Sequence, residues 1–278
     1  LDAHEDAVCV FFDSEFGAEK YFDTMNIDRS RVIHVPFENL EELKMQCTNM
    51  IEKVEASDHV IFFIDSVSQT ASKKEMQDTL DGKSVADLTR AREMNSFLRI
   101  ITPKINLRKI PFLVINSFYD DMDNQYADPI IKGGKQIFLS SDSLFFVSRT
   151  QEKNDATKEL LGWTFKYKSM KSRFVKEKAV FPLTVLYDGG IDVYSGMLEL
   201  ARIGGFVTMP SSGWYTRPFI EGDKKWQKKQ LDDSFWEPVL ANPEYQKFCR
   251  EFYSLETGAM FTEQSIDEET GEIVTRKA

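Results

Sequence analysis

Two apolar segments that end in acidic residues decide the fold: AVCVFFDSE, residues 7–15, and VIFFIDS, residues 60–66. Each begins with a short, continuous apolar run of strand length. Continuous runs, unlike alternating ones, are typical of strands that are covered on both faces of a parallel sheet. Comparable runs occupy residues 32–35, 112–115 and 144–147, and we predict a strand at each.

Segments with helical periodicity separate several of these runs. Apolar residues recur every one to four positions between Leu40 and Val54, and again at helical spacing between Met94 and Ile105. This spacing predicts amphipathic helices. Strands that alternate with helices predict an α/β sheet whose crossovers are right-handed.

The pattern changes in the second half of the chain. Residues 163–168 alternate Trp, Phe and Tyr with Thr and Lys, which predicts a strand with one apolar and one basic face. Residues 183–187 predict a further strand. From Ile191 onward we expect a small, mostly helical unit, with Asn242 and Pro243 at the start of one helix.

The predicted change of architecture gives a domain boundary. We divide the chain into a core, residues 1–188, and a small C-terminal domain, residues 189–278. The last segment, residues 263–278, has five acidic and two basic residues and few apolar ones, so we expect a flexible acidic tail.

Composition narrows the class of protein. The 278 residues, 42% of them hydrophobic, suffice for one large domain or a core with an appendage. The 35 basic and 45 acidic residues give a net charge of −10, which alone argues against a general nucleic-acid binder. No apolar run approaches 18 residues, so we predict no transmembrane helix. The three cysteines are expected to be reduced thiols in a cytoplasmic chain, and three scattered histidines do not suggest a zinc site.

Acidic residues follow two of the predicted parallel strands. Asp13 and Glu15 follow the first run, and Asp65 follows the run at residues 60–64. In open α/β sheets, ligands bind at the carboxyl ends of strands. One carboxylate there can hold Mg²⁺, directly or through water, and another can polarise a water against a γ-phosphate. The alternative is that these side chains only solvate strand ends or cap helices.

Polar residues also follow the run at residues 112–115. Asn116 and Ser117 could contact a γ-phosphate or could form a simple turn. The polar stretch at residues 118–136 is too long for a tight connection, and loops of this kind are usually functional or disordered. Its paired glycines, Gly133 and Gly134, could give it mobility.

Positive charge is concentrated in KYKSMKSRFVKEK, residues 166–178, where six basic residues and one acidic residue give +5. Such a segment suits a phosphate or a nucleic-acid backbone, although a solvated strand face is an equal alternative. The sequence Gly82-Lys83-Ser84 resembles the end of a phosphate loop, but the motif requires glycine at position 77, which is Gln. We therefore reject it as a phosphate loop.

Together these segments resemble the phage UvsX branch of the RecA-type recombinases. The resemblance covers nearly the whole chain, and its motifs occur in the family's order: FFDSEFG at residues 11–17, FFIDSVSQTASKKE at 62–75, KSRFVKEK at 171–178, YDGGIDVYSGMLELA at 187–201 and SGWY at 212–215. It implies an α/β RecA-like P-loop NTPase core, with a mostly parallel sheet and a small, mainly helical C-terminal domain.

The resemblance also implies roles at a bound nucleotide. Glu15 would be the general base that activates the attacking water. Asp65, with Ser66 beside it, would be the Walker B carboxylate that supports Mg²⁺ through water. Tyr21 would stack on adenine. Ser117 stands where the family places a γ-phosphate sensor, usually Gln or His, and a serine is too short to span the same gap without a water.

Further implied residues contact a neighbouring protomer or DNA. Lys171 and Arg173 match a basic pair that reaches the γ-phosphate of the neighbouring protomer, where positive charge stabilises the transition state as an arginine finger does. The first DNA loop would lie near residues 73–84 and the second at residues 118–135. The residues expected to bind DNA are Lys73, Lys74, Lys83, Lys132, Gly133, Gly134 and Lys135.

The implied function is ATP-dependent recombination and repair. Such a protein binds single-stranded DNA, self-associates into a helical filament with ATP and Mg²⁺ at protomer interfaces, and exchanges strands with a homologous duplex in the cytoplasm of the host cell. The family's Walker A loop and first strand would precede residue 1, so we expect a truncated fragment that binds ATP poorly alone. The alternatives are a non-catalytic DNA-binding or filament-interaction protein, and a related hexameric helicase or clock-type ATPase.

Overall fold

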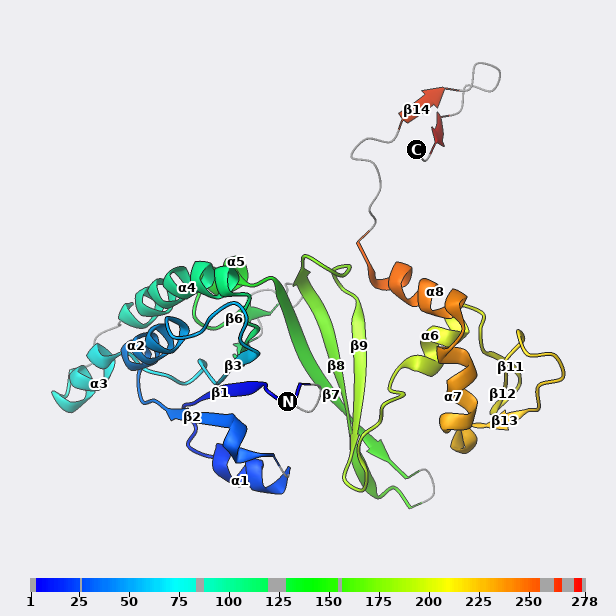
Figure 1. The fold of residues 1–278 in the computed structure, drawn as a ribbon, viewed down its shortest axis with the longest axis horizontal. Coiled ribbons are helices and arrows are strands. Elements are labelled where there is room, and N and C mark those ends of the chain that lie inside the picture. The colour runs from blue at the N-terminus through cyan, green and yellow to red at the C-terminus, as the bar shows by residue number, and fades with distance from the viewer. Residues whose placement is uncertain are drawn as a thin grey trace. The chain divides into compact units, whose positions relative to one another are not determined.

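Contacts divide the chain into two compact units, Leu1–Ser141 and Asp142–Ala278. The computed structural model (Figure 1) describes residues 4–25, 27–83, 88–119, 129–154 and 157–255, and the backbone of residues 263–266 and 273–276. The boundary that we predicted from the sequence, between residues 188 and 189, differs from this division between Ser141 and Asp142 and stays a prediction.

A four-stranded parallel sheet forms the centre of the first unit. Its order is β2 (Val32–Pro36), β1 (Val8–Asp13), β3 (Val60–Asp65) and β4 (Phe112–Val114), and all three pairings are parallel. This order confirms the predicted parallel α/β arrangement. Because neighbouring parallel strands end at the same edge of a sheet, their carboxyl ends meet at one place.

The helices of the first unit are α1 (Ala18–Thr24), α2 (Leu40–Ile51), α3 (Lys73–Leu80), α4 (Thr89–Arg108) and α5 (Lys135–Ser140), with a 3₁₀ turn at Arg29–Arg31 and a small hairpin of β5 (Phe118–Tyr119) and β6 (Ile130–Ile131). Figure 1 shows α2 and α4 side by side. Their apolar faces pack on the sheet, as the periodicity predicted. Fully buried members of this core include Leu43, Ile51, Phe97, Phe12 and Phe62.

An antiparallel sheet begins the second unit. Its order is β10 (Gly190–Ile191), β9 (Val180–Leu186), β8 (Leu160–Ser172) and β7 (Ser143–Lys153). Residues 144–147, predicted among the strands of a parallel sheet, lie instead in the antiparallel strand β7. The predicted strand at residues 163–168 lies within β8, and the one at residues 183–187 overlaps β9, which ends at Leu186. The face of β8 that we predicted to be basic also carries Thr164, which is buried. The Thr164 hydroxyl lies 2.6 Å from Glu152 Oε1 and 2.7 Å from Thr184 Oγ1.

The rest of the second unit is mainly helical, as predicted. It contains α6 (Met197–Ile203), α7 (Asp233–Leu240) and α8 (Pro243–Tyr253), with short strands β11 (Thr208–Ser211), β12 (Trp214–Thr216) and β13 (Trp226–Gln227) and a 3₁₀ turn at Lys228–Gln230. Asn242 caps α8, since its Oδ1 accepts the Glu244 N–H at 2.9 Å. Phe235, Trp236 and Tyr245 are buried in a core of their own.

The segment predicted to be a flexible tail contains the antiparallel pair β14 (Glu263–Ile266) and β15 (Ile273–Arg276). The remainder of that segment lies outside the described residues. Within the described part of the chain, no helix combines the length and apolar character that crossing a membrane requires. The three cysteines are free thiols, as expected, and Cys47 is buried.

The buried ring of Phe62 gives a test of the first unit's core. We expect Phe62→Ala to lower the free energy of unfolding by about 3–5 kcal/mol, because a fully buried ring is lost and a cavity remains. Leu107→Ala, on the exposed face of α4, is the control and should change stability by less than about 0.5 kcal/mol. Urea unfolding followed by far-ultraviolet circular dichroism measures both, and equal effects would contradict the predicted core.

Candidate functional site

The carboxyl edge of the parallel sheet collects the acidic residues that the sequence singled out. Asp13 and Asp65 end the neighbouring strands β1 and β3 and are opposite one another in the strand register. Glu15 follows two residues beyond Asp13 and is exposed. The structure therefore brings together three carboxylates from distant segments, as predicted, but their surroundings differ.

Asp13 is occupied by donors from the protein itself. Its side chain is 2% exposed; Oδ1 accepts the N–H groups of Glu15 and Phe16, both at 2.9 Å. Oδ2 accepts the Ala18 N–H at 3.2 Å and lies 3.0 Å from His34 Nε2. Burial raises the pKa of Asp13, but the hydrogen bonds from His34 and the backbone outweigh burial and hold the pKa below its ordinary value. The structure therefore supports the alternative interpretation of Asp13, in which its side chain caps the chain segment that leads into α1.

Two serines join the ends of β1 and β3. The Ser14 hydroxyl donates to the Ser66 carbonyl at 2.8 Å, and the Ser66 N–H donates to Ser14 Oγ at 3.0 Å. The Ser66 hydroxyl lies 2.6 Å from Ser68 Oγ and donates to Glu15 Oε1 at 3.4 Å. The Asp65–Ser66 peptide bond is cis. The Ser66 hydroxyl thus supplies a hydrogen-bond donor to one oxygen of Glu15.

In contrast to Asp13, Asp65 lies in surroundings that disfavour the charged form of its carboxylate. Burial raises the pKa of Asp65, and the negative charges of Glu15 and Asp13 raise it further. A divalent cation between Asp65 and Glu15 would relieve this repulsion, and oxygen ligands suit Mg²⁺. The donor set therefore fits Mg²⁺ held by one carboxylate and completed by waters and phosphate oxygens. By themselves, the described residues contain no cluster of three side chains suited to hold a metal.

The end of β4 is tied to the same edge and to the loop that follows. The Val67 N–H donates to the Ile115 carbonyl at 3.0 Å. Asn116 Nδ2 donates to the Lys132 carbonyl at 2.7 Å, and the Lys132 N–H donates to the Ser117 carbonyl at 3.1 Å. Asn116 Oδ1 and Ser117 Oγ are buried without a hydrogen-bond partner among the described residues.

Two of these contacts were not visible in the sequence. In the sequence, His34 is one of three scattered histidines that suggest no zinc site and no other role, yet its Nε2 lies 3.0 Å from Oδ2 of the buried Asp13. Asn116 was considered beside Ser117 as a phosphate sensor, yet its amide clamps the base of the following hairpin. The remaining nucleotide candidate, Tyr21, lies on α1 and is 64% exposed, which leaves its ring accessible for stacking.

The first group of predicted DNA-binding lysines surrounds α3. Lys73 and Lys74 begin this helix and Lys83 follows it. Lys74 forms an ion pair with Asp78, and Lys83 pairs with Asp81 at 2.9 Å. These acidic partners reduce the positive field that DNA phosphates would encounter at α3.

The second group surrounds the paired glycines. Gly133 and Gly134 have φ values of 93° and 91°, a region that favours glycine. A Cβ at Gly133 would lie 2.9 Å from Ile137 Cδ1, so a side chain there would displace the end of Ile137. Lys132 and Lys135 flank this turn, and neither forms an ion pair with another described residue. The centre of this loop, residues 120–128, lies outside the described residues.

The predicted basic pair belongs to the second unit. Lys171 is opposite Leu144 and Ser169 is opposite Phe145, so β8 bulges by one residue beside Lys171. The Arg173 guanidinium lies 3.1 Å from Asp142 Oδ1, and their side chains are 63% and 46% exposed. An ion pair at this exposure contributes about 0–1 kcal/mol, so Asp142 does not fix Arg173 in place.

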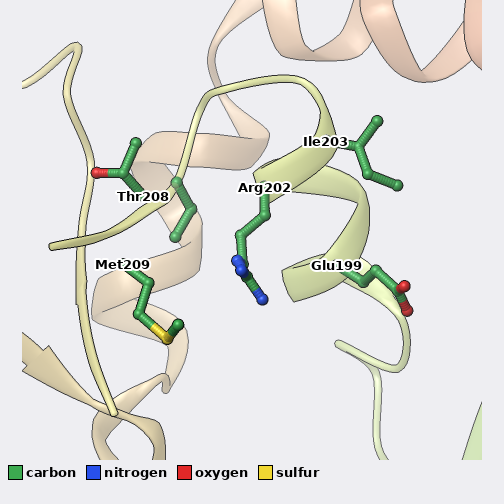
Figure 2. Close-up of a pocket in the computed structure, with 6 residues that line it drawn as sticks. Glu199, Arg202, Ile203, Thr208 and Met209 are labelled. Atoms are coloured by element: carbon green, nitrogen blue, oxygen red, sulfur yellow. The ribbon is translucent and has the colours of Figure 1, made fainter. Parts of the chain in front are cut away.

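The second unit also has cavities that the predicted nucleotide site does not use. Figure 2 shows one of about 390 Å³ between α6 and β11, with Arg202 and Met209 directed toward it. Another, of about 760 Å³, has Lys166, Lys176 and Lys178 among its lining residues. None of the residues predicted to contact nucleotide lines either cavity.

The fold and its acidic edge define the class of protein as an α/β protein with a RecA-like core, and comparisons with known proteins give the family. The family described as "Bacteriophage T4, Recombination and repair protein, C-terminal domain" matches residues 194–250. The recombination and repair protein of Enterobacteria phage T4 is 36% identical over 99% of this chain and 71% of its own length. The chain belongs to the family of this phage protein, which confirms the resemblance seen in the sequence.

Two weaker similarities are also found. Protein RecA of Streptomyces rimosus is 25% identical over 87% of this chain and 62% of its own length. The crystal structure of the RadB recombinase covers 67% of this chain and 78% of its own, with 14% identity and a TM-score of 0.47. The chain thus spans less than two thirds of this RecA protein. The sequence relationships do not favour the alternatives of a non-catalytic fragment or a helicase.

The raised pKa of Asp65 predicts a pH-dependent gain of stability in Asp65→Asn. The folded state penalises ionised Asp65, so the substitution should raise Tm at neutral pH, and the gain should vanish as pH falls below about 4, where unfolded Asp is protonated. Thermal unfolding in the presence of a chelator measures it. Asp81→Asn is the control and should lower Tm at neutral pH, because hydrogen bonds from Lys83 and Gln77 lower the pKa of Asp81 in the folded state. A loss of stability in Asp65→Asn at neutral pH would contradict this electrostatic description.

Proposed function

We propose that the protein containing this chain is an ATP-dependent recombinase that acts in DNA recombination and repair in the host cytoplasm. Family membership supports the process, since the phage T4 relative is a recombination and repair protein. The observation that carries the chemistry is the acidic edge, where Asp65, with its raised pKa, lies beside an exposed Glu15. Such an edge suits a magnesium nucleotide.

Mg²⁺ and ATP, when bound, supply charge neutralisation and a phosphoanhydride bond that water can cleave. Asp65 would hold Mg²⁺ through water, and Ser66 would keep the two strand ends together. The exposed ring of Tyr21 would stack on adenine. The Ser117 hydroxyl, buried without a partner in the described structure, would donate to a bound water or a phosphate oxygen, and Asn116 Oδ1 would accept from a bound water.

Glu15 is the residue best placed to act as general base. Its Oε1 accepts from the Ser66 hydroxyl, which leaves the other oxygen to take a proton from the attacking water. Asp13 cannot do this, because its two oxygens are already engaged by three backbone N–H groups and His34. The selection of Glu15 therefore follows from the hydrogen bonds rather than from strand-end position alone.

Self-association would complete the site. Lys171 and Arg173 would place positive charge at the γ-phosphate bound by a neighbouring protomer and stabilise the charge that develops in the transition state. The weak, exposed pairing of Arg173 with Asp142 leaves the guanidinium able to exchange partners. Repetition of this contact would build a helical filament, with the nucleotide at each interface.

DNA would bind through the loops beyond the acidic edge. Single-stranded DNA, and then a homologous duplex, would contact the seven residues predicted from the resemblance. Of these, Lys132 and Lys135 flank a glycine turn that is clamped to the end of β4, while Lys74 and Lys83 are paired with aspartates. We expect the glycine turn to carry the larger share of phosphate binding.

We also propose that residues 1–188 act as the ATPase and DNA-binding core and that residues 189–278 form a separate small domain. Two observations support this boundary. The aromatic core around Trp236 draws its buried members from residues 201–245, and the T4 C-terminal family matches residues 194–250. Limited proteolysis near residue 189 tests the boundary.

Removal of the proposed base should abolish turnover without removing binding. In the protein with any coding sequence upstream of residue 1 retained, Glu15→Gln should lower DNA-stimulated ATP hydrolysis about 10²–10⁴-fold. Nucleotide and DNA affinities should stay within about twofold, because a neutral amide of the same size remains. Glu55→Gln, an exposed residue between α2 and β3 at the opposite edge of the sheet, is the matched control. Unchanged turnover in Glu15→Gln would remove Glu15 from the mechanism, and an absence of DNA-stimulated hydrolysis in the unsubstituted protein would contradict the proposed function.

Lysine substitutions should rank the two DNA loops. Lys132→Ala and Lys135→Ala should each weaken binding to single-stranded DNA and reduce the slope of log K against log salt by about 0.7, as one lost phosphate contact does. Lys74→Ala and Lys83→Ala should have smaller effects, because both lysines already have acidic partners. Fluorescence anisotropy at several salt concentrations measures all four. Larger effects at Lys74 and Lys83 would reverse the ranking.

A further inference from the structure

The imidazole of His34 lies against the most tightly held carboxylate in the first unit. His34 belongs to β2 and is opposite Phe11 of β1 in the strand register. Its ring lies beside two aromatic neighbours that contact one another, with centroids 6.4 Å from Phe11 and 6.0 Å from Phe22. Nε2 lies 3.0 Å from Asp13 Oδ2, while Nδ1 lies 3.7 Å from Glu19 Oε1, a long contact to an exposed side chain. The ring is thus held by packing, and its hydrogen bond is directed at Asp13.

Asp13 in turn determines the path of the chain that carries Glu15. Its carboxylate accepts from the N–H groups of Glu15, Phe16 and Ala18, so it holds the connection between β1 and α1 in one conformation. Phe16 has a φ of 56°, which residues other than glycine rarely adopt. A non-glycine residue keeps such a backbone only when its surroundings enforce it, and here the Asp13 carboxylate supplies that enforcement.

We infer that Asp13 and His34 are positioning residues for Glu15. His34 fixes the orientation of the buried Asp13 carboxylate, and the carboxylate fixes the turn from which the Glu15 side chain extends toward Ser66. Without the imidazole donor, Oδ2 would keep only the Ala18 N–H at 3.2 Å, and the carboxylate could rotate. The inference rests on the proposed role of Glu15 as general base.

The expected consequence is specific to the chemical step. A shift of about 1 Å in a catalytic group costs about 10²-fold in rate, whereas the sites that bind ATP and DNA lie on other side chains. Loss of the His34 hydrogen bond should therefore lower kcat and leave KM for ATP and the affinity for DNA nearly unchanged. A purely structural role would lower stability and binding together with turnover.

The test compares three substitutions in the protein with any upstream coding sequence retained. His34→Phe keeps a planar ring beside Phe11 and Phe22 but removes the donor, and should lower kcat of DNA-stimulated ATP hydrolysis about 10–10²-fold. His34→Gln restores an N–H donor and should recover most of that loss. Glu19→Gln, on the Nδ1 side of the ring, is the matched control and should keep wild-type turnover.

A double variant asks whether His34 acts through Glu15. If it does, Glu15→Gln combined with His34→Phe should turn over no more slowly than Glu15→Gln alone, because residues that act as a unit are not additive. Hydrogen exchange at the Glu15, Phe16 and Ala18 amides adds a readout that needs no activity, and His34→Phe should accelerate it.

The outcomes separate the inference from the proposed function. Unchanged turnover in Glu15→Gln would overturn the role of Glu15 and this inference with it. If Glu15→Gln loses turnover but His34→Phe keeps wild-type kcat and amide exchange, the inference alone is overturned. A further loss in the double variant, or a loss in His34→Phe that His34→Gln does not recover, would also overturn it.

Discussion

The buried negative charge of Asp13 is the constraint on which the acidic edge depends. A carboxylate that is 2% exposed must be matched by donors, because an uncompensated buried charge costs several kcal/mol. Three backbone N–H groups and one imidazole provide that match. The requirement sets the course of the chain from β1 into α1. Glu15 lies within this turn, so the buried charge orients the proposed base.

The same constraint explains why two aspartates at equivalent strand ends differ. Asp13 and Asp65 are opposite one another on β1 and β3, yet the pKa of Asp13 is lowered and that of Asp65 is raised. Donors surround the first, whereas burial and two neighbouring carboxylates act on the second. Because donors within the protein hold the Asp13 carboxylate in its charged form, Asp13 places a fixed negative potential on Asp65. This potential favours a cation beside Asp65. Identical residues thus divide between a structural role and the proposed metal-supporting role.

The sequence was informative wherever one local signal determined the outcome. Continuous apolar runs located β1 and β3, helical spacing located α2, and the carboxyl-end rule placed Asp65 beside Glu15. It was silent where partners come from distant segments. His34 contacts Asp13 across neighbouring strands, and nothing in its own segment reveals that contact.

Charge distribution and connectivity together indicate how an acidic chain could engage DNA. The net charge of −10 opposes binding in general, so contact must come from a few local cations, within about 10 Å of the phosphates at moderate salt. The glycine turn is suited to this, because the Val67 N–H holds Ile115 and the Asn116 amide holds Lys132. Hydrogen-bonded segments therefore connect the residues after Asp65 to Lys132 without interruption. The lysines at the turn and the carboxylates at the edge therefore belong to one hydrogen-bonded part of the first unit.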